Sequence, residues 1–139
     1  MRKASLLIGG CLMLALALNV WAYQTTHPEI MQSVMATRNA ITEHIEGGDA
    51  EATAESAMQL QGLFESLLPI GERMNLAPMY ATIANKAAAN AGMTAEAAKS
   101  GNMEAAAASH ETIGKTCEGC HGQFREKADD GSYRIKTEQ

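Results

Sequence analysis

The sequence has 139 residues, of which 46% are hydrophobic, 19% are charged and 4% are aromatic, and its formal net charge is −5. This length suits one domain, and an acidic chain with few aromatic residues lacks the basic, stacking surface of a nucleic-acid-binding protein. The chain contains only three Pro, and its three Cys cannot all pair with one another, so the composition favours a helical domain without a disulfide framework.

Residues 1–22 differ from the rest of the chain. Two basic residues precede an apolar run over residues 6–20, and Ala22 supplies a small residue before a cleavage site. This pattern predicts a secretory signal peptide, which leaves a mature domain of residues 23–139 in the periplasm. An uncleaved membrane anchor is the alternative, because the apolar run approaches the length of a membrane span. A lipoprotein signal at Cys11 is disfavoured, because the apolar run continues beyond that residue.

Four stretches of the mature chain carry apolar residues at helical spacing. We expect helices over residues 28–46, from a cap at Asp49 to just before Pro69, over about residues 78–99, and from a cap at Asn102 to about Lys127. No window alternates in the manner of a strand, and a polar, loose tail is expected from about residue 129. The sequence therefore predicts an all-α, antiparallel up-down-up-down four-helix bundle.

The sequence Cys117-Glu118-Gly119-Cys120-His121 is the attachment signature of c-type haem. Residues three and four apart share a helix face, so both thiols can reach the edge of one porphyrin and form thioether bonds with its vinyl groups. His121 would then lie beneath the iron as an axial ligand. A redox dithiol or half of a zinc site are alternatives, but the mature chain has no second Cys pair and no βαβ pattern. The motif predicts one covalent haem c.

A second axial ligand must precede the motif, because only 18 residues follow His121. In such a bundle, the end of the last helix lies beside the start of the first, the end of the second and the start of the third. The candidate ligands at this depth are Met31, Met35, Met74, Met79 and His27. His110 lies on the same helix as His121, about 16 Å away at 1.5 Å per residue, which is too far to bind the same iron. Spacing alone does not choose among these candidates.

Two segments resemble the class II cytochrome c family (cytochrome c′ and cytochrome c556), over about residues 29–127. These are CEGCHGQFR (residues 117–125), similar to the family's C-x-x-C-H-x-x-[FY]-R ending, and MQSVM (residues 31–35), similar to its first helix. The resemblance implies Met35 as the distal iron ligand, since members with Met there are low-spin His/Met electron carriers. It also implies Gln32 at the haem edge and Arg125 at a propionate. Met31 stands where the family usually has Arg and is therefore a rival ligand.

These observations lead us to expect a periplasmic monohaem cytochrome that transfers single electrons between redox proteins and is not an enzyme. Its acidic mature chain, with nine basic and 16 acidic residues and a net charge of −7, suggests basic or patch-complementary partners. The alternative is a high-spin haem protein that binds nitric oxide or carbon monoxide, as family members with Leu at the distal position do. Family members often form homodimers, although no residue of this sequence establishes a dimer.

Overall fold

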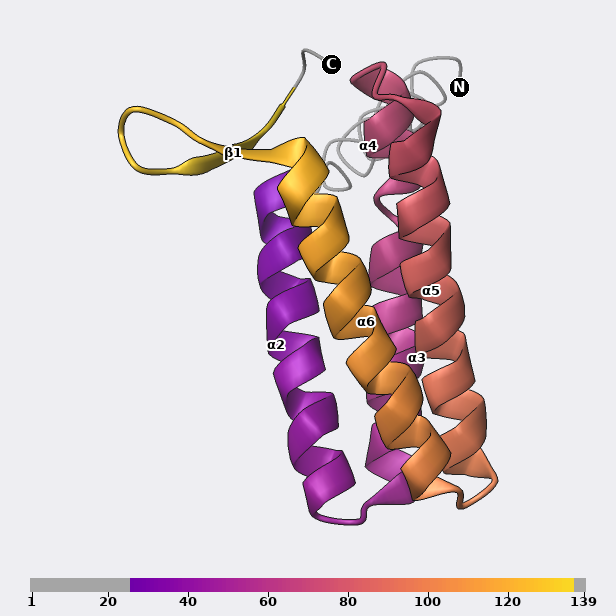
Figure 1. Ribbon diagram of the computed structural model, residues 1–139. Coiled ribbons are helices and arrows are strands. Elements are labelled where there is room, and N and C mark those ends of the chain that lie inside the picture. The colour runs from indigo at the N-terminus through magenta and orange to yellow at the C-terminus, as the bar shows by residue number, and fades with distance from the viewer. Residues whose placement is uncertain (1–25, 137–139) are drawn as a thin grey trace, which may run out of the picture.

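The computed structural model describes residues 26–136, so the predicted signal peptide and Cys11 lie outside the described residues. Four long helices form an antiparallel bundle (Figure 1): α2 (His27–Glu46), α3 (Ala50–Glu65), α5 (Pro78–Lys99) and α6 (Met103–Phe124). The four predicted helices and their arrangement are confirmed. In residues 26–136, no helix combines the length and the apolar character that a membrane crossing requires.

The helix starts follow the capping residues that the sequence predicted. The Asp49 carboxylate accepts a hydrogen bond from the backbone N–H of Ala52 at 3.0 Å, and the Asn102 side chain accepts one from Ala105 at 3.1 Å. Gly101 has a φ of 77°, a left-handed conformation that favours glycine where α5 turns into α6. Sharp turns therefore join α2 to α3 and α5 to α6 at the same end of the bundle, which we call the loop end.

Three local features differ from the sequence prediction. A short helix, α4 (Leu68–Arg73), lies in the connection between α3 and α5, and α6 ends at Phe124 rather than near Lys127. Two strands, β1 (Arg125–Lys127) and β2 (Tyr133–Ile135), then pair in an antiparallel hairpin. The prediction that the chain has no strand was wrong. Three-residue strands are too short to show an alternating pattern, and the turn that joins them depends on local polar contacts: the Asp130 carboxylate accepts hydrogen bonds from the Ser132 N–H and hydroxyl at 2.9 and 2.6 Å.

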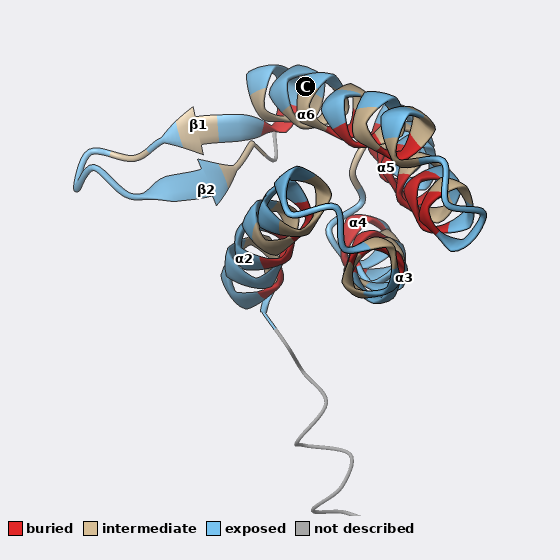
Figure 2. Ribbon diagram, turned by 90° about the horizontal axis from the view of Figure 1, so that it is seen from below, coloured by how far each residue is buried: buried red, intermediate tan, exposed pale blue. Residues whose placement is uncertain are grey.

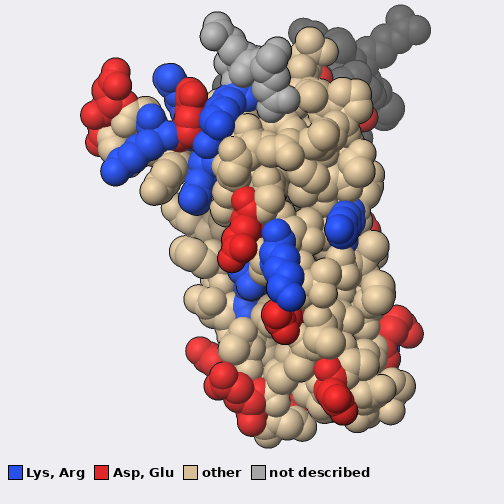
Figure 3. Space-filling view, viewed as in Figure 1, with Lys and Arg blue, Asp and Glu red and all other residues tan. Residues whose placement is uncertain are grey.

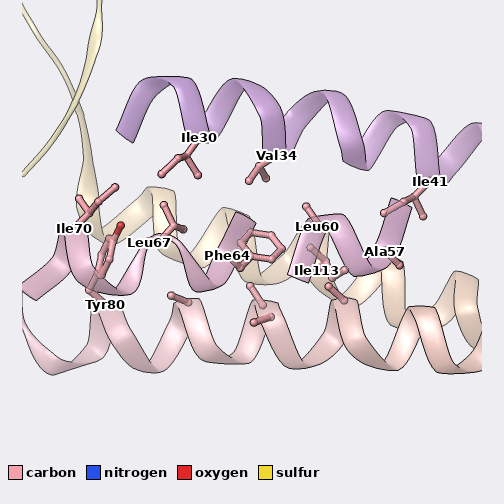
Figure 4. Packing of buried hydrophobic residues seen from close by; sticks show 14 of the residues in the cluster. Ile30, Val34, Ile41, Ala57, Leu60, Phe64, Leu67, Ile70, Tyr80 and Ile113 are labelled. Atoms are coloured by element: carbon pink, nitrogen blue, oxygen red, sulfur yellow. The ribbon is translucent and has the colours of Figure 1, made fainter. Parts of the chain in front are cut away.

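Buried residues line the inner faces of all four helices (Figure 2). At the loop end the helices meet through small residues, and a separate cluster there consists of Ala54, Ala98 and Ala106. At the opposite end, where α6 ends and the hairpin begins, the core contains large side chains (Figure 4): Phe64, Leu67, Ile70 and Tyr80. We call this second region the cavity end.

Candidate functional site

A cavity of about 450 Å³ lies at the cavity end, between the ends of the four long helices. Its volume is within the range of about 300–1,000 Å³ that is typical of sites for small molecules and cofactors. Much of its wall is apolar, and side chains of α2, α3, α5 and α6 contribute to it: Val34, Phe64, Leu67, Ile83, Ala84, Ala87 and Phe124. The bundle thus leaves a space for an apolar group at this end.

The three residues of the haem-attachment motif all line this cavity. Cys117, Cys120 and His121 project from the last turns of α6, and both cysteines are free thiols. Burial raises the pKa of both thiols. A redox dithiol needs a lowered thiol pKa, and the C-terminal half of a helix, with its negative dipole end, does not provide one. The environment therefore argues against the dithiol alternative.

The imidazole of His121 is half-buried at the edge of the same cavity. Burial lowers its pKa, and the positive charge of Arg125 lowers it further. The pKa of His27, which also lines the cavity, is lowered by burial and by the charge of His121. Both shifts favour the neutral ring, which has a lone pair available for a metal ion.

The structure separates the five candidates for a second axial ligand into two groups. Met31, Met35 and His27 line the cavity together with His121. Met74 and Met79 do not line it, and their side chains are exposed. The bundle therefore leaves three residues of α2 as candidate ligands.

His110, excluded by its distance along the helix, lies outside the cavity wall. It is buried, and its Nε2 lies 3.1 Å from the Thr42 hydroxyl oxygen on α2. This contact fixes the register of α2 against α6. Counting seven residues toward the cavity end from each partner places Met35 level with Cys117, and counting eleven places Met31 level with His121.

Side-chain direction then distinguishes the two methionines. Helical side chains lean toward the N-terminus of their own helix, so those of two antiparallel helices lean in opposite directions. By this rule the His121 ring is expected to lean inward along the bundle and the Met35 side chain outward, so that the two converge, whereas Met31 is expected to lean away from His121. Met31 also packs against the core, while Met35 is 64% exposed and free to contact a ligand in the cavity. This geometry favours Met35.

Gln32 and Arg125, which the family resemblance placed at the haem edge, also line the cavity. Two further arginines that the sequence did not single out, Arg38 on α2 and Arg134 on β2, belong to the wall, and no Asp or Glu of residues 26–136 does. Arg125 lies over the ring of Tyr133 at 4.3 Å from its centre, and Arg134 pairs with Glu126 at 2.6 Å. An apolar wall with three arginines and no carboxylate fits an apolar, anionic group.

Tyr80 forms the inner wall of the cavity on α5. Its ring lies edge-on to Phe124, with 5.3 Å between the ring centres, and it occupies the space that a side chain at Gly71 would need, since a Cβ there would be 2.5 Å from the ring. The Tyr80 hydroxyl is buried without a hydrogen-bond partner in the described part of the chain, and burial raises its pKa to about 12. This buried hydroxyl group in the cavity wall is thus available to a bound group or to a water molecule.

Comparison with models of protein families, with curated proteins and with solved structures finds no match to this chain. Across residues 26–136, no three His, Cys, Asp or Glu side chains are arranged to hold one metal ion. The cavity wall holds two thiols and two imidazoles, those of Cys117, Cys120, His27 and His121. These four groups are not gathered around one point as a tetrahedral zinc site requires, so the arrangement argues against the zinc alternative.

Proposed function

We propose that this protein is an exported monohaem c-type cytochrome of the class II kind, which carries single electrons between periplasmic redox proteins. One observation carries the proposal: the C-x-x-C-H motif, a facing methionine and three arginines all line a single apolar cavity. Each feature alone is compatible with a different role, but a porphyrin with two vinyl groups, an iron and two propionates accounts for all of them at one place.

The residues present fit such a group. Cys117 and Cys120 would hold it covalently from one helix face, and His121 would ligate the iron with its neutral imidazole. Met35 would supply a second iron ligand, a thioether, which favours the reduced iron. When bound, the haem supplies the one-electron chemistry.

The rest of the wall would exclude water and position the polar edge of the haem. Phe64, Leu67 and Ile83 give the macrocycle an apolar surface, which keeps water from the iron. Arg125 and Arg134 stand at the rim, on the hairpin, where propionates reach solvent. Gln32 contributes an amide at the same rim. In the resembling family, an arginine usually stands at the position of Met31 and contacts a propionate. Here the arginines of the hairpin would make that contact instead.

A second function, binding of nitric oxide or carbon monoxide, is favoured by one observation. Met35 is 64% exposed, so little packing by the described residues holds its thioether in one position. A weakly held methionine can yield its position to a diatomic ligand. The two functions therefore differ in whether Met35 stays bound to the ferric iron at rest.

Absorption spectra of the exported protein in both oxidation states test the proposal. We expect low-spin ferric iron with a weak near-infrared band from the methionine-to-iron bond. Met35→Leu is expected to abolish that band and give high-spin iron that binds carbon monoxide, while Met31→Leu leaves the spectrum unchanged. High-spin iron in the wild type would favour the gas-binding function, and loss of the band in Met31→Leu alone would assign the ligand to Met31. A protein without haem absorption would overturn the proposed function itself.

A further inference from the structure

The guanidinium group of Arg38 stands in the cavity wall without a carboxylate partner. Its Nε is buried and makes no hydrogen bond within the described residues. Three ion pairs form in residues 26–136, and none of them includes Arg38. An unpaired charge in a partly apolar environment is unfavourable, so its position at a cavity wall points to a function toward the occupant of that cavity.

Helix α6 leaves room for this cation. A Cβ at Gly114 would lie 3.1 Å from the Arg38 Nη2, so the guanidinium rests against the α6 backbone at a position without a side chain. Gly114 lies four residues after His110 and three before Cys117, on the same helix face. Arg38 thus lies at the cavity wall slightly closer to the loop end than Cys117.

The charge of Arg38 affects the pKa of residues on both sides of Gly114 along α6. It contributes, after burial, to the lowered pKa of His110, and it partly opposes the rise in the Cys117 pKa that burial causes. The other two arginines of the wall differ, because Arg125 stacks on Tyr133 and Arg134 is paired with Glu126 on the exposed hairpin. Arg38 is the arginine of the wall that lies deepest along the bundle.

We propose that Arg38 sets the redox potential of the group held by Cys117, Cys120 and His121, by favouring its reduced state. This inference rests on the proposed function. Reduction transfers one electron from an external one-electron donor to the iron, lowers the net charge of the haem by one, and forms or breaks no bond. A fixed cation beside the haem repels the more positive, oxidised state, and this effect is strong where water is excluded.

The test is a spectroelectrochemical titration of the haem-loaded protein and three variants. Arg38→Met keeps a linear side chain but removes the charge, and we expect it to lower the ratio of reduced to oxidised protein about tenfold at a fixed potential. For a one-electron couple this equals a midpoint lower by about 59 mV. Arg38→Lys keeps the charge and is expected to retain most of the potential. Lys115→Gln removes an exposed cation beside Gly114, and we expect no change because solvent screens it.

Stability of the cofactor-free protein provides the second readout. Since Arg38→Met removes a half-buried charge that has no ion-pair partner in residues 26–136, we expect its urea midpoint to equal or exceed that of the wild type. A midpoint potential that is the same in Arg38→Met and in the wild type would overturn the inference, and a less stable cofactor-free variant would then assign Arg38 a structural role. If Arg38→Met takes up haem poorly, Arg38→Gln gives the same comparison. Absence of haem from the wild type is visible in its spectrum beforehand and would overturn the proposed function together with this inference.

Discussion

The two ends of the bundle are made from the same four helices, but they are built differently. At the loop end, side chains as small as those of Ala54, Ala98 and Ala106 fill the interior. At the cavity end, large side chains surround a space of about 450 Å³ that they do not fill. Interiors of folded proteins are normally close-packed, so the contrast indicates that the cavity end is shaped for an occupant and the loop end is complete by itself.

Charge separates the two ends as well. Acidic side chains gather at the loop end (Figure 3), where the elements carry Glu43, Glu46, Asp49, Glu51, Glu96 and Glu104. Basic side chains gather on the hairpin at the cavity end, which carries Arg125, Lys127 and Arg134, but Glu126, Asp129 and Asp130 lie there as well. The loop end is therefore acidic, whereas the hairpin carries charges of both signs. Under the proposed function, a redox partner that approaches the cavity end would meet a mixed surface.

The greatest change is expected from the cysteines of the cavity end. Replacement of both Cys117 and Cys120 by Ala removes both thioether bonds, so we expect no covalent haem in the exported protein. A denaturing gel stained for haem measures this directly. Cys120→Ala alone is expected to weaken or abolish the signal. A haem-stained band of normal intensity in the double variant would contradict the assignment.

A pair of substitutions one turn apart on α5 compares the two kinds of packing. Ala91 is fully buried outside the cavity, and Ala87 is buried but lines it. In the cofactor-free protein, Ala91→Leu overpacks a filled interior and is expected to lower the free energy of unfolding by about 1–3 kcal/mol. Ala87→Leu extends into the cavity, so we expect a smaller loss of stability but reduced haem uptake. Urea denaturation and haem content measure the two effects, and equal losses of stability would show that the cavity end is already filled.

A pH effect is expected midway along the bundle, at His110. Burial, followed by the charge of Arg38, lowers the pKa of this histidine below 6.5, so the folded protein holds it neutral. Between the unfolded and folded pKa values the unfolded chain binds more protons, and stability therefore falls as the pH is lowered from about 6.5. We expect His110→Gln to reduce this loss in urea denaturation of the cofactor-free protein. Identical pH profiles for the variant and the wild type would contradict this role, and the titration of His27 and His121 cancels in the comparison.

The weakest effects are expected from the caps of the loop end. Asp49→Ala and Asn102→Ala each remove a side-chain acceptor from the first turn of a helix, and each is expected to destabilise the protein by about 1 kcal/mol without altering haem content. Thermal denaturation and haem staining together test this. A cap variant that lost haem would show that the two ends are coupled rather than separate.

The four helices could be predicted from the sequence, because apolar spacing, caps such as Asp49 and Asn102, and Gly101 act locally. The hairpin could not, because its strands are three residues long and depend on side-chain contacts such as that of Arg134 with Glu126. Arg38 was missed for a different reason. It lies three residues after Met35 on the same face of α2, and an arginine at such a position normally points to solvent. Here the missing side chain at Gly114 leaves space for the guanidinium group against α6.

The proposed function depends on one haem bound covalently at the cavity end, and the intact mass of the purified exported protein is the decisive test of that bond. We predict the mass of a chain beginning at Tyr23 plus one haem, retained under denaturing conditions and lost when Cys117 and Cys120 are replaced. The mass of the polypeptide alone, with two thiols that react with an alkylating reagent, would contradict the proposed function.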